Sequence, residues 1–260
     1  ANNRKNINPL YKSGRDLQRI TNWDAFDDKD DEDDAKVDQM VRIIQYLKTL
    51  PVKTVSIDKV EADDIISYLS KVVIKDPKDK AFIVSSDKDF IQLVSDNVIV
   101  YRPMEKEYYT EQTVIDKYKM SPKNFILHKT LLGDNSDKIK GVKGLGEKGL
   151  LKKFPELIEK DMNWDDILNI CENKMSDHVV YARIIHGQDD LEKNYKIMDL
   201  SNPMLSKKDK EWLDEVVKSN DLSYYPDQFV AMYNEDQIGG LIRNVDFWVK
   251  DVFQDLLENK

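Results

Sequence analysis

The segment AFIVSSDKDFIQLV, residues 81–94, contains the elements from which the fold can be predicted. AFIVSS (81–86) is typical of a buried strand, and KDFIQLV (88–94) begins a helix. Strands are also predicted over KTVSI (53–57) and NVIVYRP (97–103). Between them, EADDIISYLSKVVI (61–74) has acids in its first turn, where the helix dipole favours negative charge. Strands that alternate with helices in this way predict an α/β fold with a parallel sheet.

The pattern becomes helical after this core. SPKNFILHKTLLG (121–133) predicts a helix with Ser121 as N-cap and Pro122 at its first position, and most of the remaining chain also has a helical pattern. Before the core, VDQMVRIIQYLKTL (37–50) predicts an amphipathic helix, whose apolar face would be Val37, Met40, Val41, Ile44 and Leu47. We expect three parts: an α/β core over 1–120, a helical module over 121–200 and a helical C-terminal extension over 201–260.

The net charge of −9 is unevenly distributed. Residues 16–38 carry ten acids and three bases, a local −7, so the rest of the chain is near −2. Residues 134–153 carry six lysines and three acids, a local +3. The acidic average therefore does not exclude a nucleic-acid partner. The run DDKDDEDD (27–34) is typical of a mobile loop.

Several other classes of protein are disfavoured. The sequence has no apolar run long enough for a transmembrane helix and no signal-peptide core, so we expect no membrane partner. The lone Cys171 favours a reducing, cytoplasmic setting, and we interpret it as a small buried hydrophobe. His128, His178 and His186 lack the spacing of metal ligands and are expected on helix surfaces or in the core.

Acidic residues of special interest fall in three groups: Glu61, Asp63 and Asp64; Asp87 and Asp89; Asp134 and Asp137. The first two groups lie near the expected strand ends, and open α/β sheets bind ligands beyond the carboxyl ends of their strands. Seven converging carboxylates would repel one another unless hard divalent cations bound them. Two such ions about 4 Å apart can hydrolyse a phosphodiester. Each group alone is explained as well by helix capping or a turn, but their coincidence favours a metal site.

A glycine-rich segment, IKGVKGLGEKG (139–149), follows the third acidic group. Gly144 and Gly146 flank one apolar residue, which allows a tight hairpin whose amides, at the start of the helix EKGLLKKF, could bind phosphate. Counter-charge for a nucleic-acid backbone would come from Lys138, Lys140, Lys143, Lys148, Lys152 and Lys153. The simpler alternative is a connection between two helices with solvated lysines.

These motifs together resemble the structure-specific 5′ nucleases, which include phage 5′ exonucleases, flap endonucleases and the 5′-nuclease domain of bacterial DNA polymerase I. The matching pieces occur in the family's order: RKNINPLYKSGR (4–15), VEADD (60–64), VSSDKDFIQL (84–93) and GDNSDKIKGVKGLGEKG (133–149). LEKNYKIMDL (191–200) resembles the end of the family's second domain. The resemblance implies a PIN-like α/β nuclease core followed by a helix–three-turn–helix DNA-binding module, with the phage exonucleases most similar.

The resemblance also implies roles for individual residues. Two Mg²⁺ or Mn²⁺ ions would be held by Glu61, Asp63, Asp64 and Asp87 on one side and by Asp89, Asp134 and Asp137 on the other. Arg4, Lys12 and Arg15 would contact the scissile phosphate and stabilise developing charge, with Tyr11 in the same DNA-guiding segment. The hairpin would grip duplex DNA through Lys138, Lys140, Gly141, Lys143, Gly144, Gly146 and Lys148, and a K⁺ ion is a further expectation there.

The sequence departs from the family in two ways. Family members have two aspartates on strands before the segment that matches residues 4–15, and neither has a counterpart here. We expect an N-terminal segment that this sequence does not include or that a separate polypeptide supplies; the alternative is a chain that has lost catalysis. The acidic run at 27–34 lies where the family has an arch over the 5′ strand (about 4–38), although acids repel DNA phosphates.

The expected function is a divalent-metal-dependent 5′-3′ exonuclease or flap endonuclease. It would act near 5′ ends, flaps or junctions of DNA, or on the RNA of RNA–DNA hybrids, in replication or repair, in the host cytoplasm if phage-encoded. One alternative is a catalytically silent module that binds branched DNA, and another is a PIN-type ribonuclease, which does not explain GVKGLGEKG. The C-terminal helix could dock a replication partner, but packing onto the rest of the chain explains it more simply.

Overall fold

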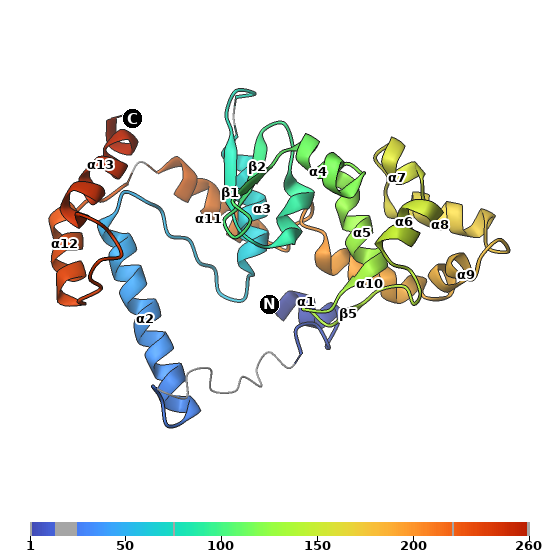
Figure 1. Cartoon of the computed structure of the whole chain (residues 1–260). Helices are drawn as coiled ribbons and strands as arrows, with labels where there is room; N and C mark the ends of the chain where they lie inside the picture. The colour runs from blue at the N-terminus through green and yellow to red at the C-terminus, as the bar shows by residue number, and fades with distance from the viewer. Residues whose placement is uncertain (1, 14–24, 75, 220, 259–260) are drawn as a thin grey trace. The chain divides into compact units, whose positions relative to one another are not determined.

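A computed structural model describes residues 2–13, 25–74, 76–219 and 221–258 (Figure 1). The chain divides into two compact units, one made of residues 1–15 and 57–214, the other of residues 16–56 and 215–260. The domain boundary expected near residue 200 falls inside the first unit.

A mixed sheet forms the centre of the α/β part of the first unit. Strands β1 (Ala81–Val84) and β2 (Val98–Arg102) are parallel, as the alternating pattern predicted, and β3 (Glu107–Tyr109) pairs antiparallel with β2. The register places Ala81 opposite Val98 and Val100 opposite Tyr109. Helix α3 (Ala62–Val72) and the 3₁₀ helix η1 (Lys88–Leu93) lie beside the sheet (Figure 1).

The two faces of this sheet differ in burial. Ile83 and Val100 point into an apolar cluster that also contains Phe90 and Ile91 of η1. On β1, Phe82 alternates with Ile83 and is exposed, as expected for the period of two along a strand. The core therefore lies on one face of the sheet, and η1, which carries Asp89, is fixed against it.

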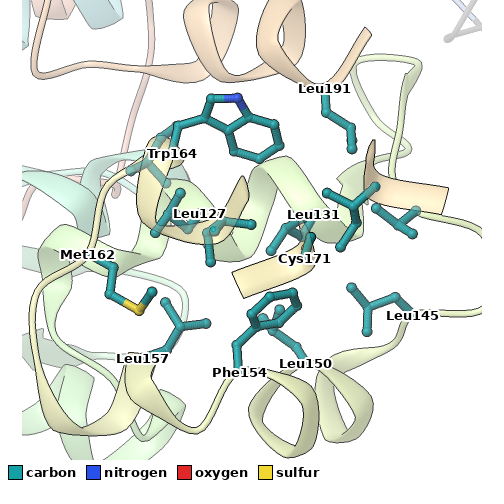
Figure 2. Close-up of a cluster of buried hydrophobic side chains, with 14 of the residues drawn as sticks. Leu127, Leu131, Leu145, Leu150, Phe154, Leu157, Met162, Trp164, Cys171 and Leu191 are labelled. Carbon is teal, nitrogen blue, oxygen red and sulfur yellow. The ribbon is translucent and has the colours of Figure 1, made fainter. Parts of the chain in front are cut away.

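The helical part of the first unit has its own core. Leu127 and Leu131 of α5 pack with Phe154, Trp164 and neighbouring side chains (Figure 2). The elements of this unit outside the sheet region are α1 (Asn2–Ile7), α4 (Glu111–Tyr118), η2 (Pro122–Asn124), α5 (Phe125–Leu132), β4 (Gly133–Asp134), β5 (Ile139–Lys140), α6 (Glu147–Lys153), α7 (Glu156–Glu159), α8 (Trp164–Asn173), α9 (Val179–His186), α10 (Gln188–Met198) and the first part of α11 (Lys207–Lys218).

The second unit consists mainly of α2 (Lys29–Thr49), α12 (Pro226–Glu235) and α13 (Val245–Glu258). Its core is formed by Leu50, Phe229, Tyr233 and Val249. The C-terminal helix, α13, thus contributes to the core of this unit. None of the helices in the described ranges is long and apolar enough to span a membrane.

The acidic run at 27–34 is not a loop, which corrects the prediction. Asp28 caps α2, its side chain accepting a hydrogen bond from the Asp31 amide, and residues 29–34 form the first turns of the helix. Acids in a first turn are favoured by the helix dipole. Ion pairs Lys29–Asp33 (3.2 Å) and Lys36–Glu32 (3.1 Å) offset the repulsion among the remaining charges.

Three further expectations need correction. Residues 53–57 form no strand. Residues 88–93 form a 3₁₀ helix, not an α-helix, which Asp87 caps. The predicted apolar face of α2 is exposed from Val37 to Ile44: Val37 and Met40 each keep 60% of their surface accessible, and Ile44 keeps 37%. Ser121 does occupy the predicted N-cap position, but its side chain accepts no hydrogen bond from a helix amide, and its hydroxyl donates to Asp161 Oδ1 (2.6 Å).

Candidate active site and nucleic-acid surface

Arg4 and Asp64 form a buried ion pair. The guanidinium of Arg4, on α1, donates to both carboxylate oxygens of Asp64 (2.5 and 3.0 Å) and, through Nε, to the carbonyl of Ile197 (2.8 Å). Asp64 also accepts from the Met204 amide (2.9 Å), and the two charged residues are only 3% and 1% exposed. The expected contact of Arg4 with a phosphate is therefore not available in this structure, and the lone pairs of Asp64 are engaged by protein donors.

Glu61, the N-cap residue of α3, is surrounded by cationic and hydroxyl groups. Lys12 Nζ lies 2.9 Å and Arg4 Nη1 3.4 Å from its Oε2, which also accepts from the Tyr11 hydroxyl (3.1 Å). Burial acts to raise the pKa of Glu61, but the hydrogen bond from Lys12 and the Arg4 charge outweigh it and lower this pKa. Tyr11 is 4% exposed, so it supports Glu61 from inside the fold and has no accessible DNA-binding face.

Asp63 and Asp87 have a different environment. Burial, followed by the charges of Asp87 and Glu61, raises the pKa of Asp63. Asp87 follows β1, and its Oδ1 accepts from the Asp89 amide (2.9 Å). Within the described ranges, the Asp63 side chain makes no hydrogen bond or direct ion pair. The charge of Lys12 acts in the opposite direction, but no described cation forms an ion pair with either carboxylate. Two carboxylates that repel each other in this way are a donor set that suits a hard divalent cation.

Lys129, which the sequence reasoning missed, links the other acids. Its ammonium forms ion pairs with Asp89 of η1 and with Asp134 of β4, the latter at 2.9 Å. Burial acts to raise the pKa of Asp134, but hydrogen bonds from Lys129 and Ser136 outweigh it and lower the pKa to about 2. The available signal was a lysine within the mainly apolar stretch FILHKTLL.

Asp137 contacts both Asp134 and the backbone of Lys12. It is 9% exposed, its amide donates weakly to Asp134 Oδ1 (3.4 Å), and its carbonyl accepts from the Lys12 amide (3.1 Å). The backbone of the Lys12 segment is thereby attached to the loop that carries Asp134. Arg15, the remaining predicted catalytic residue, lies outside the described residues.

A cleft of about 480 Å³ opens above the second acidic group. Its lining includes Asp87, Asp89, Lys129, Asp134 and Ser136. No set of three or more histidine, cysteine or acidic side chains in the described part of the chain is arranged to hold a metal ion. Mg²⁺ commonly uses one or two carboxylates and keeps several waters, so Asp63 with Asp87 still fits such an ion, whereas Asp89 with Asp134 is neutralised by Lys129.

The glycine-rich segment adopts the alternation that its sequence predicts. Ile139, Val142 and Leu145 are buried. The lysines are exposed except for Lys153, which is half-buried, and no ion pair links any of them to another described residue: Lys138, Lys140, Lys143, Lys148, Lys152 and Lys153. Because no acidic partner among the described residues neutralises them, these six lysines give the segment a positive charge that suits a phosphate backbone.

The glycines of this segment serve different purposes. Gly144 has φ +82° in a turn closed by the Leu145 amide and the Val142 carbonyl (3.1 Å). Gly141 allows close packing, because a Cβ there would lie 2.1 Å from the Leu132 carbonyl carbon. A Cβ on Gly146 would meet no atom within 4 Å. Gly144 and Gly146 are exposed, whereas Gly141 packs closely against the end of α5.

Two side chains that sequence reasoning also missed fix the backbone of this turn. Arg183 of α9 donates to the Lys143 carbonyl (2.7 Å), and buried Asn194 of α10 donates to the Lys140 carbonyl (2.9 Å). These two hydrogen bonds, one from an exposed arginine and one from a buried asparagine, fix the backbone that carries the two lysines.

The residues expected to be structural are placed accordingly. Cys171 is fully buried, and burial raises its thiol pKa to about 12, so it is a core side chain. His128 stacks on Phe125 with ring centroids 5.2 Å apart, and His178 caps α9 through Nδ1, which accepts from the Val180 amide (3.2 Å).

The fold and these motifs are similar to those of known 5′ nucleases. Residues 1–119 match the family model described as 5′-3′ exonuclease, N-terminal resolvase-like domain. The 5′-3′ exonuclease of Aquifex aeolicus (strain VF5) is 32% identical over 165 residues, 62% of this chain and 53% of that protein. DNA polymerase I of Bacillus subtilis (strain 168) is 38% identical over 130 residues, 47% of this chain and 14% of the polymerase. The chain spans about half the length of the curated exonucleases it matches.

Solved structures from bacteriophage T5 share the fold. A T5 flap endonuclease, solved as a complex with DNA and metal ions, superposes with a TM-score of 0.66 at 20% identity, over 83% of this chain and 80% of that one. A T5 5′-exonuclease with bound zinc gives a TM-score of 0.64 at 21% identity, over 82% and 78%. These matches confirm the predicted resemblance to the 5′ nucleases and the predicted fold, an α/β core with a helical region.

Proposed function

We propose that the chain is a divalent-metal-dependent nuclease that hydrolyses phosphodiester bonds near 5′ ends, flaps or junctions of DNA. The observation that supports the proposal is that Asp63 and Asp87, which repel each other, occur in the same unit as six lysines of residues 138–153 that form no ion pair with another described residue. The names of the relatives, 5′-3′ exonuclease and flap endonuclease, support the reaction class.

Asp63 and Asp87 are the proposed metal ligands of first choice. A bound Mg²⁺ or Mn²⁺ would supply an activated water and stabilise the leaving oxygen. Glu61, whose pKa is lowered, stays ionised and adds negative charge beside Asp63. The T5 structures that contain metal ions support a divalent cofactor; the choice of Mg²⁺, and of K⁺ at the glycine turn, is part of the proposal.

Lys12 is the proposed group that stabilises charge on the phosphate. Its ammonium is 2.9 Å from Glu61, and its side chain is 21% exposed, so it is partly accessible from solvent. A positioned cation at this point favours the charge that develops on the phosphate oxygens during in-line attack. Arg15, three residues further on, is proposed for the same purpose from the resemblance alone.

Arg4, Tyr11 and Asp64 are proposed as positioning residues, not as direct contacts of DNA or metal. The hydrogen bond from Arg4 to Asp64 joins α1 to α3, and the hydrogen bond from Tyr11 holds the Glu61 carboxylate. Glu61 in turn accepts from Lys12 and so positions its ammonium group. This assignment replaces the roles that the resemblance implied for these three residues.

The glycine-rich segment, with the lysines that flank its turn, is proposed to bind the backbone of duplex DNA beside the cut. Lys138, Lys140, Lys143 and Lys148 would contact phosphates, and the accessible backbone at Gly144 and Gly146 would allow a close approach. Such contacts carry little sequence information, which suits an enzyme that recognises a DNA structure.

A catalytically silent module that binds branched DNA is the second candidate. The observation in its favour is that Asp64, Asp89 and Asp134 are already paired with protein cations. A silent module would retain the lysine surface and bind DNA without requiring Asp63 or Asp87.

The experiment that separates the two candidates uses a 5′-labelled flap duplex. The chain is incubated with it in Mg²⁺, in Mn²⁺ and in EDTA, and binding is measured in parallel in Ca²⁺. Cleavage that EDTA abolishes supports the nuclease, whereas binding without cleavage under every metal condition supports the silent module. A matched substrate with an RNA 5′ strand tests whether hybrids are also cut.

A further inference from the structure

Three elements converge on the ammonium group of Lys129. The side chain comes from α5 and is 10% exposed, and it meets Asp89 from η1 and Asp134 from β4. Asp89 and Asp134 retain 16% and 20% of their side-chain surface, so all three charged groups line the cleft with most of their surface buried.

This placement is unusual for a lysine. The other residues of α5 are mainly apolar, and burying an ammonium costs free energy unless carboxylates compensate its lost hydration. Here two carboxylates do so. The arrangement resembles a cation site whose cation is supplied by the chain, since one positive charge sits between two oxygen ligands from different elements.

We propose, building on the proposed function, that Lys129 is the resident cation of the Asp89–Asp134 pair and controls access of a divalent ion to it. An ammonium and a divalent cation repel strongly at distances of a few ångströms, so both cannot occupy the pair together. A divalent ion enters only when Lys129 withdraws. Asp63 and Asp87, which have no such lysine contact among the described residues, bind the ion that the chain holds without DNA.

The proposal predicts how substitutions change metal binding. In Mn²⁺ titrations followed by electron paramagnetic resonance and calorimetry, without DNA, the unaltered chain binds one tight ion. Lys129→Met keeps the length of the side chain and removes its charge, so a second site appears, at least about tenfold tighter than any second site of the unaltered chain. Adding Asp134→Asn to this variant abolishes the gained site.

Two controls separate a specific effect from a general change in charge. Lys88→Met removes a lysine from the lining of the same cleft, and it leaves the number of tight ions at one. Lys129→Arg keeps the positive charge and also leaves one tight ion. Equal Mn²⁺ binding by the unaltered chain and Lys129→Met, or an equal gain in Lys88→Met, overturns the proposal.

A second pair of variants covers the case in which Lys129→Met does not fold. Asp89→Asn is expected to leave the affinity for the first Mn²⁺ ion unchanged, while Asp63→Asn lowers it at least about tenfold. Equal losses of affinity for the first Mn²⁺ ion in Asp89→Asn and Asp63→Asn would overturn the assignment of Lys129 as the resident cation. Failure of the proposed function is distinguishable, because then the chain would not cleave the flap duplex whatever the Mn²⁺ stoichiometry.

Discussion

Arg4→Met tests whether Arg4 supports the fold or contacts the phosphate. The substitution removes three hydrogen bonds, two to Asp64 and one to the Ile197 carbonyl. It leaves the Asp64 carboxylate, 1% exposed, with the Met204 amide at 2.9 Å but no arginine. Removing one partner of a buried ion pair typically costs about 3 to 5 kcal/mol, so we expect a loss of that size in the free energy of unfolding.

The assay is urea unfolding followed by circular dichroism in EDTA, so that metal binding does not contribute. The control is Lys123→Met in the same unit, which removes an exposed ion pair to Asp161 and should change stability little. Combining Arg4→Met with Asp64→Asn should recover part of the loss, because the amide carries no charge.

One result would refute this reasoning. If Arg4→Met unfolds at the same urea concentration as the unaltered chain and still loses flap cleavage, Arg4 acts on the substrate, as the family resemblance implied. If stability falls and the remaining folded protein still cleaves, the positioning role is supported.

Three other predictions concern charge. Asp63→Asn should raise the free energy of unfolding in EDTA by about 0.5 to 2 kcal/mol, because it removes repulsion from Asp87 and Glu61. The same substitution should abolish cleavage. An unchanged or lower stability in calorimetry would contradict the predicted repulsion. The pKa of Asp134 is lowered from 3.8 to about 2, so its carboxylate stabilises the fold by roughly 2 kcal/mol above about pH 4. This stabilisation is lost as the pH falls toward 2. Urea unfolding of Asp134→Asn in EDTA should lack that part of the pH dependence. Lys143→Met should reduce the salt dependence of DNA binding by about one phosphate contact in fluorescence anisotropy, whereas an unchanged slope would place this lysine outside the interface.

Features decided by local pattern could be predicted from the sequence. β1 and β2 lie where apolar runs predicted strands. In the glycine-rich segment, Ile139 and Val142 are buried and the intervening Lys140 is exposed, because the spacing of apolar residues sets which side chains face the core. The order of the motifs was also enough to recognise the family resemblance.

Pairing over long distances could not be predicted. Asp64 is sixty residues from Arg4 in the chain, and an acid in the first turn of a helix gives the same local signal whether it caps, binds metal or pairs with arginine. Likewise, Lys129 lies five residues before Asp134, but its other acidic partner, Asp89, is forty residues away in the chain and could not be predicted from the local sequence.

The acidic run shows a conflict between two valid local rules. Few apolar residues and many like charges are typical of an unstructured segment, whereas acids after an Asp N-cap are typical of a helix start. The second rule prevailed at Lys29–Thr49, where lysines four residues from acids supply ion pairs. In contrast, the β-branched run at 53–57 did not form a strand, since a strand also requires a paired neighbour.

The most direct measurement is the single-turnover rate of flap cleavage by Asp87→Asn beside a matched control, Asp96→Asn, which changes an exposed aspartate of the same unit. If Asp63 and Asp87 hold the catalytic ion, Asp87→Asn lowers the rate at least about a hundredfold while DNA binding in Ca²⁺ persists, and Asp96→Asn cleaves normally. Equal cleavage rates in the two variants would contradict a metal site at Asp87.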